Sequence, residues 1–183
     1  FNEFVFRVYG GAFSKDEQDP VTRKEIDETG ETFFRHAKVC TVKHVDGTLL
    51  GTWGLILKDL QQESDFALPI ERSFDLTVPQ ILERTGAQGI RYFFNGWRTA
   101  VDKEALDRLG YPKTASIFVF DCLLRGLTED FGGQGHLYMG VAEMEMIVYK
   151  YHRRVGVPWQ ILGDGKVKWG RERFPCAFKL GEF

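Results

Sequence analysis

Apolar and β-branched positions predict strands most clearly near residue 40. Residues 38–45 are rich in valine and threonine, which favour the extended conformation. Asp46-Gly47 follows directly, and this dipeptide is typical of tight hairpin turns. Residues 48–57 return to an apolar strand pattern. The segment therefore predicts an antiparallel hairpin.

The rest of the chain alternates between helical and strand patterns. Apolar positions at helical spacing, with a proline at the start, predict a helix over residues 113–130. Further helices are expected over residues 1–9, 75–85 and 143–155. Further strands are expected over residues 89–95, 136–142, 158–162 and 173–180. Hairpins first and strand–helix repeats afterwards predict an α/β fold with a mixed sheet, in one domain over residues 1–183.

Composition narrows the classes of function. A net charge of −2 argues against a nucleic-acid partner. Cys40, Cys122 and Cys176 lack metal-ligand spacing, so we expect reduced thiols in a cytoplasmic protein and no metal site. No apolar run reaches the roughly 18 residues of a transmembrane helix. Sixteen phenylalanines fit either an aromatic core or the lining of a cavity for a long apolar ligand.

The stretch from Phe94 to Val101 carries the first candidate chemistry. Asn95-Gly96 inside an apolar strand predicts a bulge, although a plain strand end fits as well. Backbone N–H groups released by a bulge can hold a thioester carbonyl and stabilise the oxyanion of acyl transfer. Arg98 can bind a carboxylate through its planar fork, or be a surface arginine.

Two carboxylates and a row of small residues follow downstream. Glu143 and Glu145 are placed at the start of a helix, where they suit either a base that deprotonates an amine or a charge that complements the helix dipole. Residues at alternate positions before them fit either the wall of an apolar tunnel or core packing. They are Tyr138, Gly140, Ala142 and Met144.

Other motifs carry less chemistry. Residues 132–135 (GGQG) follow a predicted helix and precede a strand, which favours a helix-ending turn over a phosphate loop. No GxSxG motif supports a serine triad. A basic cluster suits an acidic partner or complements a helix C-terminus. It consists of Lys150, His152, Arg153 and Arg154.

In order and spacing, these pieces resemble one family. The hairpin with Gly51-Thr52, the Leu68-Pro69 segment, the run Arg98-Thr99-Ala100-Val101 and residues 152–163 each match a family pattern. Together they resemble the acyl-homoserine-lactone synthases and the related N-acyl amino acid synthases, within the GNAT acyltransferase superfamily.

The resemblance implies a mostly antiparallel sheet with one splayed parallel strand pair, flanked by helices. It implies direct aminolysis of an acyl thioester carried on the phosphopantetheine of acyl carrier protein, with no bound cofactor and no covalent intermediate. Taken with the residues above, the expected catalytic residues are Arg98, Glu143, Glu145 and Asn95. The implied acyl-donor residues are Phe94, Gly96, Trp97, Thr99, Ala100, Tyr138, Gly140, Ala142 and Met144. The basic cluster becomes the expected carrier-protein patch.

The departures from the lactone synthases concern the acceptor. Asn95 stands where that group has an acidic residue, Gly54 where it has an arginine, and residues 34–36 where it has an acidic pair. In the lactone synthases, those charges serve S-adenosylmethionine binding and amine activation. Their absence favours an ordinary amino acid as acceptor, with an aromatic one such as tyrosine among the candidates. A lactone synthase using S-adenosylmethionine and a non-catalytic acyl-binding or carrier-binding module stay open as alternatives.

Overall fold

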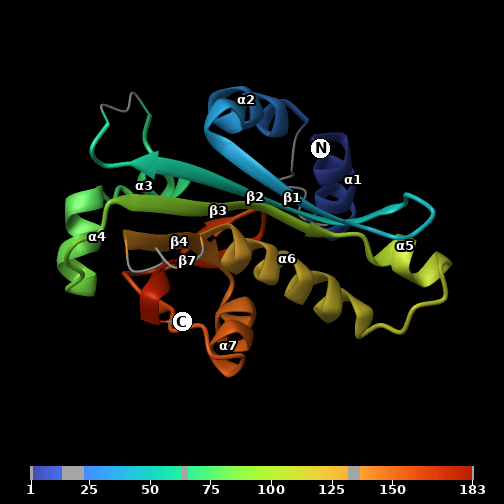
Figure 1. Cartoon of the computed structure of the whole chain (residues 1–183). Coiled ribbons are helices and arrows are strands. Elements are labelled where there is room, and N and C mark those ends of the chain that lie inside the picture. The colour runs from blue at the N-terminus through green and yellow to red at the C-terminus, as the bar shows by residue number, and fades with distance from the viewer. Residues whose placement is uncertain (1, 14–22, 63–65, 132–136, 183) are drawn as a thin grey trace. The chain divides into compact units, whose positions relative to one another are not determined.

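The computed structural model describes residues 2–13, 23–62, 66–131 and 137–182 (Figure 1). The chain forms two compact units. Unit 1 comprises Phe1–Leu55 and Arg98–Gly132, and unit 2 comprises Ile56–Trp97 and Gly133–Phe183. The glycine-rich turn expected at residues 132–135 lies outside the described residues.

Runs of one to three helices or strands follow one another along the chain. The helices are α1 (Asn2–Phe13), α2 (Arg23–Phe33), α3 (Pro69–Phe74), α4 (Val78–Thr85), α5 (Lys103–Arg108), α6 (Ala115–Phe131) and α7 (Met146–Arg154). The strands are β1 (Ala37–Lys43), β2 (Leu49–Asp59), β3 (Tyr92–Val101), β4 (Tyr138–Met144), β5 (Gln160–Ile161), β6 (Lys166–Lys168) and β7 (Arg171–Lys179). Among the described helices, none has both the length and the apolar character needed to cross a bilayer.

Hydrogen bonding joins the strands in the order β1-β2-β3-β4-β7-β5, and β6 pairs with β7 outside this path. β3 and β4 run parallel, whereas β7 is antiparallel to β4, β5 and β6. The predicted fold class is confirmed: a mostly antiparallel α/β sheet with one parallel pair and flanking helices.

Unit 1 contains the predicted hairpin, whose turn is fixed by local hydrogen bonds. Gly47 has φ 90°, a conformation that glycine adopts without strain. The backbone N–H of Thr48 donates to the Asp46 carboxylate at 2.8 Å, and this bond contributes most to lowering the pKa of Asp46 to about 2. The hairpin prediction is confirmed.

The core of unit 1 lies between the hairpin and α6. A Cβ on Gly51 would stand 2.6 Å from a methyl of Val119, so only glycine lets β2 approach α6 this closely. Leu50, Leu106 and Val119 are buried together. Asp102 caps α5 by accepting from the N–H of Ala105 at 2.9 Å.

Unit 2 contains two short helices before β3. Thr77 and Gln80 form a reciprocal capping box that starts α4, so this helix begins three residues later than predicted. The preceding helix, α3, has Pro69 in its first turn, and Glu71 accepts from the N–H of Leu68 at 2.7 Å. The sequence prediction missed α3, although proline followed by an acidic residue is a helix-start signal.

Candidate active site

The parallel pair of unit 2 ends part-way along both strands. β3 and β4 are in register from Tyr92↔Tyr138 to Asn95↔Val141. Both strands continue beyond that point, yet no further β3–β4 pairing occurs among the described residues. Gly96 and Trp97 of β3 therefore follow the end of the ladder, on the side where β4 continues through Ala142 and Glu143.

The backbone irregularity of β3 differs from the predicted bulge at Asn95-Gly96. The strand is continuous from Tyr92 to Val101, and its residue with positive φ is Arg98, at 53°. A non-glycine residue in this region carries backbone strain, which folded proteins retain where surrounding contacts hold it.

Arg98 supplies such contacts inside unit 1. Its guanidinium donates to the side-chain oxygen of Asn2 in α1 and to the carbonyl oxygen of Ile26 in α2. The Thr52 hydroxyl donates to the Arg98 carbonyl at 3.4 Å. The residue is only 6% exposed, and burial lowers the pKa of its guanidinium to about 10. These bonds correct the expectation that Arg98 binds an acceptor carboxylate, because its donors are committed to the two N-terminal helices.

Thr99 and Ala100, two expected donor residues, also belong to unit 1. The Thr99 carbonyl accepts from the Tyr9 hydroxyl at 3.2 Å. Ala100 is buried, and its carbonyl oxygen lies 3.3 Å from the position of a Cβ on Gly51. Both residues therefore take part in packing within unit 1.

Strand alternation gives the β3–β4–β7 region of unit 2 two faces. We call them the α3 face, defined by Asn95, Glu143 and Pro175, and the α7 face, defined by Phe94, Gly140 and Phe178. The registers Asn95↔Val141, Glu143↔Pro175 and Gly140↔Phe178 assign these residues.

The α3 face is polar where the ladder ends. Asn95 is 1% exposed, and its Oδ1 accepts from the N–H of Ile70 at 3.1 Å while its Nδ2 donates to the Gly96 carbonyl at 2.7 Å. Glu143 lies in β4, and not in a helix as predicted, and accepts from the Ser73 hydroxyl at 2.6 Å. Helix α3 thus holds Asn95 through its N-terminal end and Glu143 through its C-terminal end.

Glu145 differs from Glu143 in position and partner. It is the N-cap residue of α7, where its side chain makes no capping hydrogen bond. Its carboxylate lies 3.9 Å from a guanidinium nitrogen of Arg171. Of the two predicted base candidates, Glu143 is therefore the one oriented by a close hydrogen bond.

The α7 face is apolar and closely packed. A Cβ on Gly140 would stand 2.3 Å from the ring of Phe178 and 2.6 Å from that of Phe94. These two rings meet edge to face at 5.8 Å, and Trp159 contacts Phe178 at 4.4 Å. Tyr138 stacks on Tyr92 at 4.7 Å. Aromatic rings fill the space at Gly140, which fits core packing, one of the two alternatives expected for these positions.

Three other buried residues complete this face. Ala142 is opposite Cys176 and Met144 is opposite Phe174 in the β4–β7 register. Burial raises the pKa of the Cys176 thiol to about 12, which leaves it protonated and unreactive at neutral pH. The structure thus brings together the expected donor residues of β4 with Phe94 and Gly96.

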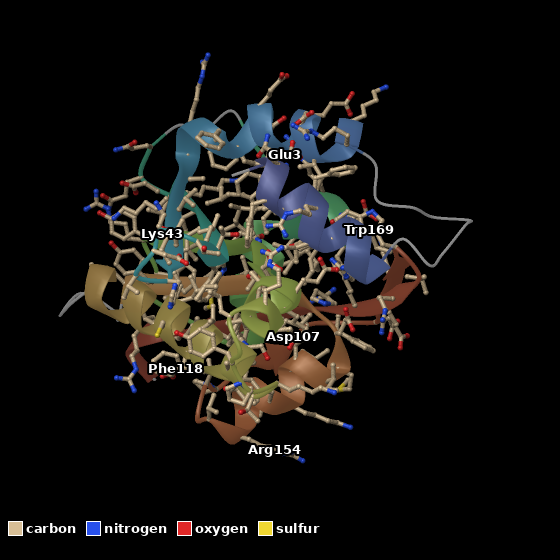
Figure 2. The ribbon with its side chains drawn as sticks, turned by 90° about the vertical axis from the view of Figure 1, so that its right-hand side faces the viewer. Glu3, Lys43, Asp107, Phe118, Arg154 and Trp169 are labelled. Atoms are coloured by element: carbon tan, nitrogen blue, oxygen red, sulfur yellow. The ribbon has the colours of Figure 1, made fainter. Side chains whose placement is uncertain are left out.

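The basic cluster of α7 divides into exposed and buried members. Lys150, Arg153 and Arg154 are exposed, and Figure 2 shows Arg154 extending outward from α7. His152 is 3% exposed, and its Nδ1 accepts from the Trp159 indole N–H at 2.8 Å. Burial lowers the pKa of His152 to about 4, so the imidazole is neutral. The inclusion of His152 in a carrier-protein patch is corrected, since a buried neutral ring presents no surface charge.

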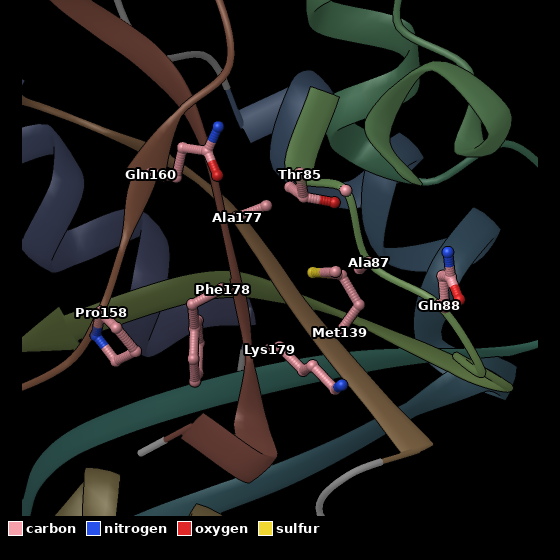
Figure 3. A pocket seen from close by; sticks show the side chains of 10 residues that line it. Thr85, Ala87, Gln88, Met139, Pro158, Gln160, Ala177, Phe178 and Lys179 are labelled. Atoms are coloured by element: carbon pink, nitrogen blue, oxygen red, sulfur yellow. The ribbon is translucent and has the colours of Figure 1, made fainter. Parts of the chain in front are cut away.

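A cavity of about 290 Å³ lies in unit 2 at the opposite end of β4 from Glu143 (Figure 3). It is lined by Thr85, Gly86, Ala87, Gln88, Met139, Pro158, Gln160, Ala177, Phe178 and Lys179. None of these residues is among the predicted site residues. In the described part of the chain, no three His, Cys, Asp or Glu side chains gather as metal ligands.

Comparison with known proteins identifies the fold. The sequence matches no protein-family model and no curated protein sequence. The structure resembles FeeM, an N-acyl amino acid synthase from uncultured soil microbes, with a TM-score of 0.60 and 14% identity over 97% of this chain and 90% of that chain. It also resembles MesI, a CoA-dependent acyl-homoserine lactone synthase, with a TM-score of 0.53 and 17% identity over 97% and 80%.

A third similar structure extends the likeness beyond the synthases. A GNAT superfamily phosphinothricin acetyltransferase from Sinorhizobium meliloti, in complex with AcCoA, matches with a TM-score of 0.51 and 11% identity over 99% of this chain and 84% of that chain. The chain therefore has the fold of the GNAT acyltransferases. The predicted relation to the N-acyl amino acid and lactone synthases is confirmed at the level of this fold.

Proposed function

We propose that this protein is an N-acyltransferase that moves a long-chain fatty acyl group from acyl carrier protein to the amine of an amino acid. The observation that carries the proposal is the end of the β3–β4 ladder, where an apolar face and a polar face share one interrupted strand pair. The fold likeness to an N-acyl amino acid synthase over 97% of the chain supports the same reaction class.

The donor thioester is assigned to the interrupted ladder. Successive N–H groups of a strand point to opposite edges, so one of the two N–H groups that follow the last β3–β4 pair, at Gly96 and Trp97, faces β4 and suits the thioester carbonyl and the oxyanion that forms from it. The acyl chain extends along the α7 face, past Ala142 and Met144. It displaces the rings of Phe94 and Phe178 from Gly140, and each buried methylene contributes about 0.8 kcal/mol.

The acceptor amine approaches from the α3 face. Its lone pair attacks the thioester carbon, a C–N bond forms, the C–S bond breaks and pantetheine leaves as a thiolate, which then takes up the proton that the amine has lost. Glu143, oriented by Ser73, accepts the proton that the amine loses. Asn95 keeps α3 in place through the N–H of Ile70. Cys176 takes no covalent part because its thiol stays protonated.

Acyl carrier protein is assigned to the exposed cations of α7. Lys150, Arg153 and Arg154 are all exposed, and none of the three forms an ion pair among the described residues. An acidic carrier surface would be attracted to such a group, which raises its association rate.

The proposal is tested with purified protein, an acyl-carrier-protein thioester of a long fatty acid, and a mixture of all amino acids. We expect mass spectrometry to detect an N-acyl amino acid that requires both donor and protein. A parallel reaction with S-adenosylmethionine in place of amino acids tests lactone synthesis. Absence of N-acyl product with every amino acid supplied would overturn the proposal, and a lactone product would assign the acceptor differently.

A further inference from the structure

We propose that Arg173 binds the carboxylate of the acceptor amino acid, on the platform formed by the Trp169 indole. This inference rests on the proposed function and names the acceptor subsite of the same site. It replaces the role expected of Arg98, whose guanidinium is bound to the N-terminal helices.

The β4–β7 register puts Arg173 on the α3 face. Glu143 is opposite Pro175, and side chains two residues apart on a strand point to the same face. Arg173 is therefore a diagonal neighbour of Glu143, with Cβ atoms about 7–8 Å apart by the usual geometry of such pairs. An α-amino acid fits this spacing, with its carboxylate on the guanidinium and its amine toward Glu143.

Contacts of Ser73 support this placement independently. Its hydroxyl donates to Glu143 at 2.6 Å, and its carbonyl accepts from the Lys166 ammonium at 2.8 Å. Lys166 is the register partner of Arg173 in the β6–β7 hairpin. The proposed base and the strand partner of the proposed carboxylate-binding arginine thus both contact Ser73, at the C-terminal end of α3.

The β6–β7 hairpin has the charge that a carboxylate requires. Residues 166–173 contain four cations and one acidic residue. Lys166 and Arg171 lie beside carboxylates, at 3.1 Å from Asp75 and 3.9 Å from Glu145. The other two cations, Lys168 and Arg173, each lie 4.9 Å from the centre of the Trp169 ring.

The turn of this hairpin is unusual for its sequence. Trp169 and Gly170 both have positive φ, 52° and 66°, as a type I′ turn requires. Asparagine or aspartate normally occupies the first position, and a bulky residue there is a conformational outlier. Trp169 is nevertheless only 9% exposed, so the chain keeps a strained turn that holds a buried indole within 4.9 Å of two cations. Strain of this kind is concentrated at ligand-binding sites.

The Trp169 indole is also suited to orient a guanidinium that binds a carboxylate. A flat aromatic face orients the planar fork of arginine, and the fork binds both oxygens of a carboxylate. Lysine at position 173 would keep the charge without the two-point geometry. A decarboxylated amine would lack the group that Arg173 recognises.

The test compares acceptors with and without a carboxylate. KM is measured for an amino acid that forms product and for its decarboxylated amine, such as tyrosine and tyramine. In Arg173→Gln we expect KM for the amino acid to rise about 10- to 100-fold, as for loss of a charge-assisted bidentate pair. KM for the amine should change less than about twofold, with Arg173→Lys intermediate for the amino acid.

Controls separate this inference from the proposed function and from misfolding. Arg108→Gln removes an exposed guanidinium of α5 and should leave both KM values unchanged. Unchanged discrimination between acid and amine in a folded Arg173→Gln variant would overturn the inference alone, as would wild-type protein that makes no such discrimination. Wild-type protein that acylates neither acceptor would overturn the proposed function together with it. If Arg173→Gln fails to fold, Arg173→Lys supplies the same comparison.

Discussion

The α7 and α3 faces of the same strands in unit 2 differ sharply in chemistry. On the α7 face, the rings of Phe94 and Phe178 close over Gly140 and meet edge to face. On the α3 face, Asn95 directly follows Phe94 in β3 and Glu143 lies three residues after Gly140 in β4, and both are held by hydrogen bonds to α3. The period of two in a strand therefore places an apolar face and a polar face on opposite sides of one strand pair. A chemical group bound between the strands would meet both.

The largest expected effect comes from removing the proposed base on the α3 face. Glu143→Gln keeps an oxygen that accepts from the Ser73 hydroxyl, so folding should be preserved. The kcat for aminolysis should fall about 10²- to 10⁴-fold, the range for loss of general base catalysis. Ser73→Ala should lower kcat less, because it leaves the carboxylate in place but unoriented. If Glu143→Gln retained the wild-type kcat, Glu143 would not be the general base.

The next effect tests whether His152, next to the α7 face, is buried away from water. His152 has a folded-state pKa of about 4, below its ordinary value of 6.5, because it is buried. Since the folded state resists protonation, stability is full above about pH 6.5 and falls as pH drops through 4. The shift corresponds to about 3 kcal/mol over that window.

Thermal unfolding followed from pH 7.5 to 4 measures this loss. His152→Asn retains an oxygen that can accept from the Trp159 indole N–H but cannot take up a proton. Its stability should therefore fall less on acidification than that of the wild type. Parallel curves for the two proteins would mean that His152 does not titrate as a buried group.

Ring packing on the α7 face is tested by Gly140→Ala. The added methyl would overlap the rings of Phe94 and Phe178, so we expect a loss of about 1–3 kcal/mol in the free energy of unfolding. Gly126→Ala in α6 is the matched control, since among the described residues its Cβ would meet the Cys40 sulfur at 3.8 Å, an ordinary contact distance. That change should be neutral or stabilise by up to about 1 kcal/mol. Equal effects in denaturant unfolding would show that the rings do not fill this space.

The smallest expected effect concerns the donor's carrier. Charge reversal of Arg153 and Arg154 should raise KM for acyl carrier protein about tenfold at low salt, and less at high salt, because both residues are exposed. KM for the amino acid should not change. A carrier KM equal to that of the wild type at low salt would limit these residues to a role at the end of the helix.

Local signals in the sequence predicted much of the fold. Asp46-Gly47 fixes its turn through bonds within five residues, and the apolar face of α6 is visible at helical spacing. The short helix α3 was missed although it has a local start signal, and its contact with the Asn95 side chain, 25 residues away, could not be predicted from local pattern. β6 was missed for a similar reason, since its three residues extend only by pairing with β7.

The candidate site was less predictable because it depends on long-range contacts. The side chain of Arg98 is of the type that binds carboxylates. In the structure it donates to the carbonyl oxygen of Ile26, which is 72 residues away in sequence. His152 lies among exposed cations in the sequence, but its side chain is buried and accepts a hydrogen bond from Trp159. Arg173 joins Glu143 only through the β7 register. No local sequence pattern predicts any of these three long-range relations.

The central claim is that this protein joins a fatty acyl chain to an amino acid. Mass spectrometry of lipids extracted from cells that express wild-type protein or Glu143→Gln at equal levels tests it most directly. We predict N-acyl amino acids in wild-type cells and their loss, or a reduction of at least about 100-fold, in cells with the variant. Lipid profiles with no N-acyl amino acid in wild-type cells would contradict the account.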